Sequence, residues 1–292
     1  MSRLRPSDRA SGGYGRRISR SAYDPRMTPA CLVCESPTDH FAAHRVLGRH
    51  DAEYRRCTKC GYVFVVAPHW LDEAYGTAIA ALDTGIVVRN LWLADVTTAL
   101  LGLTFRDVER TVDYGAGTGL FVRLMRDRGH DTYWHDAYSP NLLAIGFEAD
   151  MSERYDLATA FELVEHLPDP RAGFETLGSL APRLLISTDL LPDPAPAISD
   201  WPYYAPESGQ HIGFFTRTAL DVMAERLCRR ASSNGRNLHV LAEEPVSERL
   251  LRLLRRPKRA RWLARFGRRP GRTYTDADLM ADRLRAAQST SL

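Results

Sequence analysis

Hydrophobic and polar positions change their spacing near residue 106, which divides the chain into two parts. Before this point, apolar residues recur at intervals of three, four and seven over residues 86–103, a spacing that predicts a helix with one apolar face. After it, short apolar runs alternate with helical patterns. The predicted strands are 111–114, 132–135, 157–161, 183–188 and 238–243, and the predicted helices are 119–128, 170–180 and 216–227. This alternation predicts an α/β fold with a doubly wound parallel sheet.

The remaining patterns complete a division into five segments. Short strands are expected at 53–56 and 62–66, two helices over 70–103, and a tail helix broken by Pro257 and Pro270. The segments are an aperiodic basic arm at 1–28, a small β-unit at 29–68, a helical connector at 69–108, an α/β domain at 109–245 and a basic helical tail at 246–292.

Composition places the chain among globular proteins. It has 292 residues, 44% of them hydrophobic and 26% charged, which excludes collagen-like and coiled-coil classes. The most apolar window, 86–103, is interrupted by Arg89, Asn90 and Asp95, and we expect no membrane span. No apolar region follows the arginines at the N-terminus, so we expect a cytoplasmic protein.

Positive charge is concentrated at the two ends. Residues 249–272 hold eleven Lys or Arg and no acidic residue, and residues 1–20 hold six Arg against Asp8. The remaining 22 basic and 35 acidic residues leave the body at about −13. The basic ends could lie on nucleic acid, on another anionic surface or on a phosphorylated substrate, and a solvated charged face is the simpler alternative.

Four of the five cysteines form two pairs with the spacing of a zinc ribbon. Cys31 and Cys34 enclose two residues, as do Cys57 and Cys60, and twenty-two residues separate the pairs. Four thiolates complete the tetrahedron that Zn²⁺ accepts and leave no open position, so we expect a structural zinc ion. Two disulfides are the alternative, and three histidines between the pairs could replace a ligand: His40, His44 and His50. Cys228 lies in a helical pattern, and we expect a small core residue there.

A glycine-rich turn follows the first strand of the α/β domain, with glycines at Gly115, Gly117 and Gly119 after Asp113. The dinucleotide fingerprint requires its third glycine at position 120, which is Leu120 here. The segment instead resembles motif I of the class I S-adenosylmethionine-dependent methyltransferases. That resemblance implies a Rossmann-like methyltransferase sheet, glycines that let the backbone approach the methionine part of the cofactor, and an Asp113 carboxylate that attracts its positive charges. A tight turn without a ligand is the alternative.

Two further motifs extend the resemblance over residues 109–188. Asp136 ends the next predicted strand, where a carboxylate can accept both ribose hydroxyls; a turn or cap is its alternative role. Residues 156–170 resemble the fourth-strand motif of the same superfamily, in which the strand end, here Phe161, borders cofactor and substrate. Residues 140–155 are short for a helix plus a strand, and Phe147 and Tyr138 are candidates for adenine contact or for the core.

Glu162, Glu165 and His166 form an E-x-x-E-H pattern inside that motif. It resembles the metal-binding segment of small-RNA 2′-O-methyltransferases and of ubiquinone-pathway O-methyltransferases. The former add a later histidine, for which His211 is the counterpart. The resemblance implies Mg²⁺ or Mn²⁺ on these residues, lowering the pKa of a coordinated hydroxyl. Without metal, His166 or His211 would act as general base, with Glu165 in the same catalytic group.

The acceptor is expected after the fifth strand, where Trp201, Tyr203 and Tyr204 could wall a sugar or a planar compound. A ribbon joined to such a domain also resembles deoxysugar C-methyltransferases in architecture. The hypothesis is methyl transfer to an oxygen, or a carbon, of a small molecule such as a sugar or nucleotide sugar. The second hypothesis is a zinc-ribbon nucleic-acid binder or RNA methyltransferase whose basic tail holds phosphates.

Overall fold

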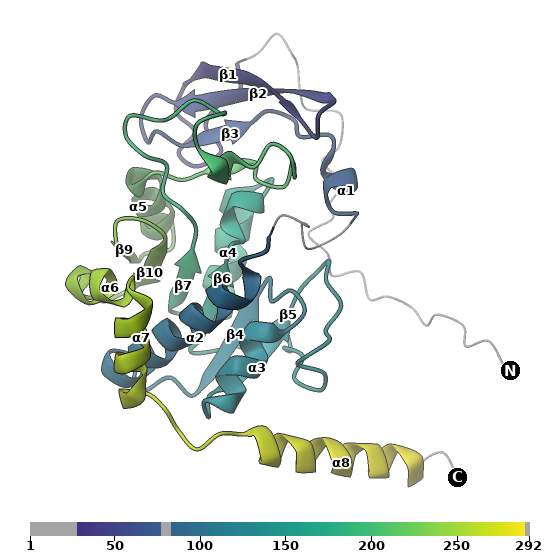
Figure 1. Ribbon diagram of the computed structural model, residues 1–292. Coiled ribbons are helices and arrows are strands. Elements are labelled where there is room, and N and C mark those ends of the chain that lie inside the picture. The colour runs from purple at the N-terminus through teal and green to yellow at the C-terminus, as the bar shows by residue number, and fades with distance from the viewer. Residues whose placement is uncertain (1–27, 77–82, 290–292) are drawn as a thin grey trace, which may run out of the picture.

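A computed structural model describes residues 28–76 and 83–289, so the basic arm expected at 1–28 lies almost wholly outside the described residues. Two sheets organise the described chain, and the smaller one lies at one end of the larger (Figure 1). The larger sheet belongs to the α/β domain. The smaller sheet carries the cysteine pairs.

The smaller sheet has the order β1-β2-β3-β8 and is antiparallel throughout. Its first three strands are β1 (Thr38–Val46), β2 (His50–Cys57) and β3 (Val63–Val65). The fourth, β8 (Gly213–Phe214), comes from beyond the fifth predicted strand and pairs Phe214 with Val63. Pairing across 150 residues of sequence thus binds the N-terminal ribbon to the α/β domain.

The larger sheet has the order β5-β4-β6-β7-β10-β9. Its strands are β4 (Arg110–Tyr114), β5 (Asp131–His135), β6 (Leu157–Phe161), β7 (Leu184–Ser187), β9 (Arg230–Ser233) and β10 (Leu238–Ala242). The pairs among β5, β4, β6 and β7 are parallel, which confirms the predicted α/β architecture. β9 was not predicted, and β10 is antiparallel to both neighbours because a four-residue turn joins it to β9.

Helices cover both faces of this sheet. The first group is α2 (Ile86–Leu103), α3 (Leu120–Asp127), α6 (Glu248–Leu254) and α7 (Pro257–Leu263), which share one apolar core with alternate strand residues such as Leu157 and Leu185. The second is α4 (Pro170–Leu180) and α5 (Arg217–Arg226), which bury Ala158, Ile186 and the ribbon's Tyr62 in another core. The two cores are the physical basis of the doubly wound arrangement.

The C-terminal tail breaks at both predicted prolines. After α7, a 3₁₀ turn η3 (Ala264–Phe266) precedes α8 (Thr273–Ser289), which runs along the lower edge of the molecule in Figure 1. Asp276 of α8 is buried and accepts hydrogen bonds of 2.7 and 2.8 Å from the Arg126 guanidinium of α3. This pair fastens the start of α8 to the domain.

Several local expectations need correction. The first connector helix is a single turn, α1 (Leu71–Ala74). Residues 136–156 contain no helix or named strand, and one bridge, Trp134 to Glu148, is the pairing found there. Cys228 is exposed, with a left-handed φ of 55° just after α5, so the core prediction was wrong: the helical pattern ends before it.

Helix α2 has the length and mean hydropathy, 1.4, of a membrane-spanning helix, so its three polar residues do not by themselves exclude a span. That resemblance concerns length and composition only. Residues 93–101 of α2 are buried in the protein core, as in a core helix of a soluble fold. No other helix among the described residues meets the same criteria.

Candidate active site

A cavity of about 970 Å³ opens where β4, β5 and β6 end. Parallel strands place their carboxyl ends at one edge of the sheet, which is where α/β folds bind ligands. The cavity brings together eight of the predicted site residues: Asp113, Gly115, Gly117, Asp136, Phe161, Glu162, His166 and His211. Gly119 and Glu165 do not line it.

The glycine-rich turn forms the floor of the cavity. Gly115, Gly117 and Gly119 have left-handed φ angles of 81°, 55° and 89°, which glycine adopts without strain. A Cβ on Gly115 would lie 2.9 Å from Cδ1 of Leu163, whereas a Cβ on Gly117 would meet no atom within 4 Å. Because Gly117 also lines the cavity, a side chain there would occupy space open to a ligand.

Asp113 is a buried carboxylate at the end of β4, on the cavity wall. The Thr159 hydroxyl donates a 2.6 Å hydrogen bond to its Oδ1. Burial raises the pKa of Asp113 to about 7, and the neighbouring charge of Asp136 adds to the rise, while the Thr159 bond opposes it. A cationic ligand beside Asp113 would stabilise its ionised form.

Asp136 organises the loop after β5. Its Oδ2 accepts from the Gly117 backbone N–H at 2.8 Å, and its Oδ1 accepts from the N–H groups of Tyr138 and Ser139 at 2.7 Å each. The turn role that the sequence left open is therefore present. A carboxylate has about four acceptor positions, so one on Oδ2 is left for a ribose hydroxyl.

Two aromatic residues form a cover beside this loop. Tyr138 and Tyr75 stack with ring centroids 5.0 Å apart and planes at 15°, and both line the cavity. Phe147, by contrast, is buried and carries the Arg126 guanidinium 3.6 Å from its ring centroid, which makes it a core residue. Sequence reasoning missed Tyr75, because it follows a single helical turn and belongs to no motif.

The two histidines present defined tautomers to the cavity. Nδ1 of His211 lies 2.6 Å from the Tyr203 carbonyl oxygen, and Nδ1 of His166 lies 3.0 Å from the Gln210 carbonyl oxygen. Because a carbonyl oxygen only accepts, each Nδ1 carries the proton and each Nε2 carries a lone pair. The rings meet edge to face with centroids 4.8 Å apart.

Two glutamates adjoin the histidines. Burial raises the pKa of both Glu162 and Glu165 to about 7, with a further rise at Glu162 from the Glu165 charge. Burial lowers the pKa of His166 and of His211 below the ordinary range, so both rings are neutral at pH 7. Glu162 has a strained φ of 49° and accepts a 2.7 Å bond from the Ser187 hydroxyl.

The chemistry of this cluster suits a divalent cation as well as proton transfer. One ligand atom from each of Glu165, His166 and His211 lies within 4.8 Å of the others, and Oε2 of Glu165 is buried without a hydrogen-bond partner. Two imidazoles held by Nδ1–H bonds to backbone carbonyls and one carboxylate form a common metal-binding set. Glu162, predicted as a fourth ligand, lies outside this group of three.

The predicted aromatic wall is only partly correct. Tyr203 lines the cavity and donates to Glu165, but Tyr204 is buried and Trp201 packs against it with centroids 5.0 Å apart. These two rings belong to the core between the ribbon and the loop after β7 because they pack around Phe214 of β8. The aromatic spacing along the loop could not reveal this division.

Residues 88–227 match a family of proteins described as "Methyltransferase domain". The matched stretch contains the glycine turn, Asp136 and both histidines. Residues 88–227 thus form a methyltransferase domain. None of the curated proteins matches the sequence.

Solved structures similar to this chain share little sequence with it. TnmH is 18% identical over 60% of this chain and 61% of its own, with a TM-score of 0.45. An O-methyltransferase family protein from Burkholderia thailandensis is 14% identical over 61% of this chain and 68% of its own, with a TM-score of 0.43. Human N-acetylserotonin methyltransferase, in complex with S-adenosylmethionine, is 13% identical over 60% of this chain and 66% of its own, with a TM-score of 0.40. This chain therefore spans about two thirds of their length or less.

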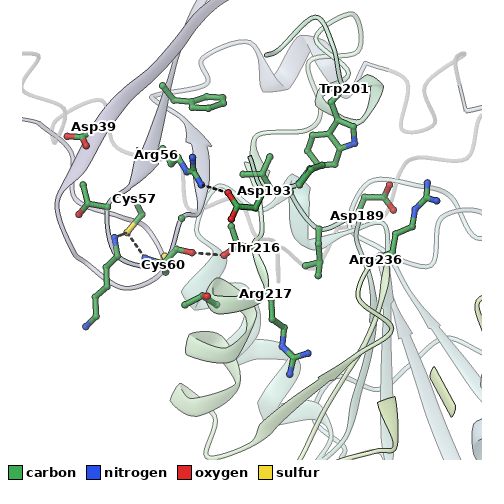
Figure 2. Close-up of a pocket in the computed structure, with 18 of the residues that line it drawn as sticks. Asp39, Arg56, Cys57, Cys60, Asp189, Asp193, Trp201, Thr216, Arg217 and Arg236 are labelled. Atoms are coloured by element: carbon green, nitrogen blue, oxygen red, sulfur yellow. Dashed lines mark hydrogen bonds and ion pairs between the residues drawn. The ribbon is translucent and has the colours of Figure 1, made fainter. Parts of the chain in front are cut away.

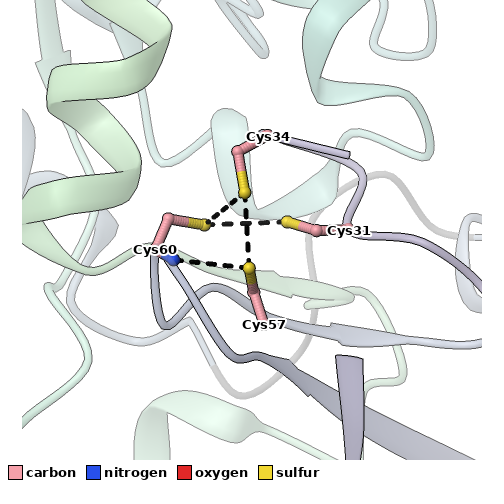
Figure 3. A group of neighbouring side chains, drawn as sticks. All are labelled: Cys31, Cys34, Cys57 and Cys60. Atoms are coloured by element: carbon pink, nitrogen blue, oxygen red, sulfur yellow. Dashed lines mark hydrogen bonds between the residues drawn. The ribbon is translucent and has the colours of Figure 1, made fainter. Parts of the chain in front are cut away.

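The fold also brings the four ribbon cysteines together (Figure 3). Sulfur atoms lie 3.6 Å apart for Cys31 and Cys60, 3.3 Å for Cys34 and Cys57, and 3.5 Å for Cys34 and Cys60. Tetrahedral zinc thiolates stand roughly 3.8 Å apart, whereas a disulfide needs about 2 Å. A hydrogen bond from Cys60 lowers the pKa of Cys31 to about 5. The four thiols thus fit a structural zinc ion, and His40, His44 and His50 are not in the set.

A second cavity, of about 1140 Å³, lies between the ribbon and the start of α5 (Figure 2). Arg56 lies 3.8 Å from Asp193 across it, and Thr216 donates to the Cys60 carbonyl at 2.5 Å. Of the residues singled out in the sequence, His40, Cys57, Cys60 and Trp201 line it, and the sulfurs of the two cysteines point to the cysteine cluster. None of the residues predicted to bind S-adenosylmethionine lies on its wall.

Proposed function

We propose that this enzyme transfers the methyl group of S-adenosylmethionine to a hydroxyl oxygen of a small, neutral or cationic acceptor. The observation that carries the proposal is the position of two neutral histidines, with Nε2 lone pairs, in the lining of the same cavity as the glycine turn. The cavity volume, about 970 Å³, is that of a small-molecule site.

The cofactor side is formed by the end of β4 and the loop after β5. The backbone of the glycine turn would lie against the methionine part, Asp113 near its positive charges and Asp136 near the ribose. When bound, S-adenosylmethionine supplies a sulfonium methyl group that is open to in-line attack. The chain's task is to align the acceptor oxygen and remove its proton.

The acceptor side is the cluster of Glu165, His166 and His211. An Nε2 lone pair takes the hydroxyl proton as the oxygen attacks, and the ring becomes a cation. The Glu165 carboxylate, within 4.8 Å, stabilises that cation because both lie in a buried, low-dielectric environment. Tyr75 lies 3.0 Å from Nδ1 of His166 and so helps fix the orientation of the ring.

Charge on the cavity wall opposes an anionic acceptor. Arg89 is the cationic side chain among the described residues that line the cavity, and both its amino groups bind Asp83 at 2.9 and 2.6 Å. The acidic lining residues are Asp72, Asp83, Asp113, Asp136, Glu162 and Glu207. A diphosphate would meet repulsion here, so we favour a polyhydroxyl compound such as a sugar over a nucleotide sugar or RNA.

A divalent cation is the alternative means of activating the same hydroxyl. Glu165, His166 and His211 would hold it, and it would lower the pKa of a coordinated hydroxyl. We favour the metal-free form because the Nε2 lone pairs suffice for proton removal.

The test combines binding and turnover. Calorimetry with S-adenosylhomocysteine should show micromolar binding, weakened by Asp136→Ala and unchanged by His166→Asn. Methyl transfer to a panel of sugars and their phosphates should then fall by about 10²–10⁴-fold in His166→Asn, the range for loss of a general base. His69→Asn, on an exposed histidine at the start of the connector, is the control. Absence of cofactor binding, or transfer only to phosphorylated acceptors, would refute the proposal.

A further inference from the structure

The outer face of α7 and η3 combines exposed positive charge with two exposed aromatic rings. The exposed basic residues are Arg255, Arg256, Lys258, Arg259, Arg261, Arg265, Arg268 and Arg269. Trp262 is 51% exposed and Phe266 is 55% exposed, although both are large apolar side chains. We call the set Arg255–Arg269, with Trp262 and Phe266, the basic aromatic face.

These charges are not neutralised within the described part of the chain. Within the described residues, 28–76 and 83–289, none of the eight side chains takes part in an ion pair. The flanking arginines do, because Arg252 pairs with Glu248 and Arg272 pairs with Asp131. Outside the two basic ends, the chain carries about −13. The face is therefore a positive area on an otherwise acidic protein, which orients it toward an anionic partner.

The helix is held firmly, so its outer face keeps one orientation. Ala260, Leu263 and Ala264 are buried against α2. A Cβ on Gly102 would lie 2.4 Å from the Gly267 nitrogen, so only glycine permits this close approach of α2 and the segment after η3. Because this segment is fixed by packing, the two exposed rings are a constant part of the protein surface and do not belong to the core.

The geometry of the two rings favours a bilayer over nucleic acid. Arg265 lies 4.7 Å over the Trp262 ring, and Phe266 meets that ring edge to face at 5.6 Å. Stacking on a base needs a free ring face, and the Arg265 guanidinium leaves one such face on Trp262 instead of two. Exposed tryptophan and phenylalanine rings flanked by arginines suit the headgroup region of a bilayer. There the rings are buried among the lipids, and the arginine cations bind lipid phosphates.

We propose that the basic aromatic face docks this enzyme on the surface of a bilayer containing anionic phospholipids. The lipid phosphates bind the Arg and Lys side chains, and Trp262 and Phe266 enter the interface between headgroups and acyl chains. This is peripheral binding, in which no helix crosses the bilayer.

The experiment is flotation of the full chain with vesicles of phosphatidylcholine alone or mixed with phosphatidylglycerol. We expect binding only to the mixed vesicles, lost at high salt. Trp262→Ala with Phe266→Ala should weaken it by about tenfold or more, since interfacial binding scales with buried apolar area. Lys258→Glu with Arg261→Glu should abolish it, while Arg45→Glu with Arg285→Glu, which changes the net charge equally, should not.

Each other outcome overturns the proposal. Absence of vesicle binding excludes the bilayer, and equal binding to both vesicles excludes the role of charge. If vesicle binding is unchanged when both rings are removed, the face binds lipid through its positive charge alone, and the proposed insertion of the rings is wrong. Single-stranded RNA bound in place of vesicles, and weakened by the same ring substitutions, assigns the face to nucleic acid. The ring variants should bind S-adenosylhomocysteine normally, because neither ring lines the cavity.

Discussion

The hydroxyl of Tyr203 donates a hydrogen bond of 2.6 Å to Oε1 of Glu165. Tyr203 lines the cavity, and Glu165 is buried behind it with Oε2 unpartnered. The bond favours the ionised carboxylate and opposes the effect of burial, which raises the pKa of Glu165 to about 7. A cavity residue thereby tunes a carboxylate that the acceptor does not touch.

Tyr203→Phe should move the pH dependence of turnover. The proposed mechanism needs ionised Glu165, so kcat should fall as pH drops through about 7. Removing the donated hydrogen bond raises the pKa of Glu165 further, and the acidic limb should shift to higher pH. The measurement is kcat against pH. Tyr204→Phe, which removes a hydroxyl bonded to the Pro196 carbonyl at 3.2 Å, should leave the limb in place.

Asp113 predicts a pH dependence of cofactor binding. Its pKa of about 7 means that the carboxylate ionises as pH rises from 6 to 8, and the cofactor is a cation. Affinity for S-adenosylmethionine should therefore increase over that interval. In Asp113→Asn the dependence should disappear. An unchanged slope in this variant would mean that another group attracts the cofactor, and calorimetry at several pH values decides.

Gly117→Ala should weaken S-adenosylhomocysteine binding by about tenfold or more, because the added methyl group enters the space of the ligand. A tenfold loss of affinity corresponds to ~1.4 kcal/mol of binding free energy. Gly235→Ala is a matched control because Gly235 also has a left-handed φ, 78°, with no atom near its Cβ position. Both variants share the backbone strain, so their melting temperatures should fall alike. Equal affinity in the two would place the ligand elsewhere.

Removal of divalent metal should leave the acceptor reaction intact. We expect turnover to persist after dialysis against EDTA, provided that the ribbon zinc is retained by elemental analysis. Loss of turnover that Mn²⁺ or Mg²⁺ restores would assign Glu165, His166 and His211 as metal ligands instead. Binding of S-adenosylhomocysteine should be unaffected in either case.

Cys31→Ser should lower the zinc content and the melting temperature, the latter by at least about 5 °C, because structural zinc contributes to folding. Turnover should also fall, since Ile212 accepts from Val65 of the ribbon and donates to the Glu165 carbonyl, both at 2.9 Å. Cys228→Ser should change none of these quantities. One equivalent of zinc in Cys31→Ser would contradict the ribbon assignment.

Much of the fold was predictable because it depends on local signals. Alternating strands and helices, the glycine turn and the cysteine spacing each act over a few residues, and β6 and α4 were predicted to the residue. The antiparallel β9 and the two-residue β8 were not, since such short strands have no periodicity and are defined by their partners.

The site divides in the same way. Asp113, Asp136 and the E-x-x-E-H residues lie in continuous motifs, so their convergence at one sheet edge could be expected. Tyr75 and Arg89 reach the cavity from outside any motif, through packing of α1 and α2. Tyr203 and Tyr204 are adjacent in sequence, but Tyr203 lines the cavity and Tyr204 is buried in the core, because they face opposite sides of one 3₁₀ turn.

The pairing of Val63 with Phe214 sets the order in which a growing chain can be completed. While the ribosome adds the intervening 150 residues, the edge of β3 has no partner. At about 5–20 residues per second, that interval lasts on the order of ten seconds. The cysteine cluster can bind its metal during this time, but the ribbon remains an open edge exposed to other chains. Zinc bound early in synthesis would then keep β1, β2 and β3 folded during this time, so that one strand edge, and not the whole ribbon, is exposed to aggregation.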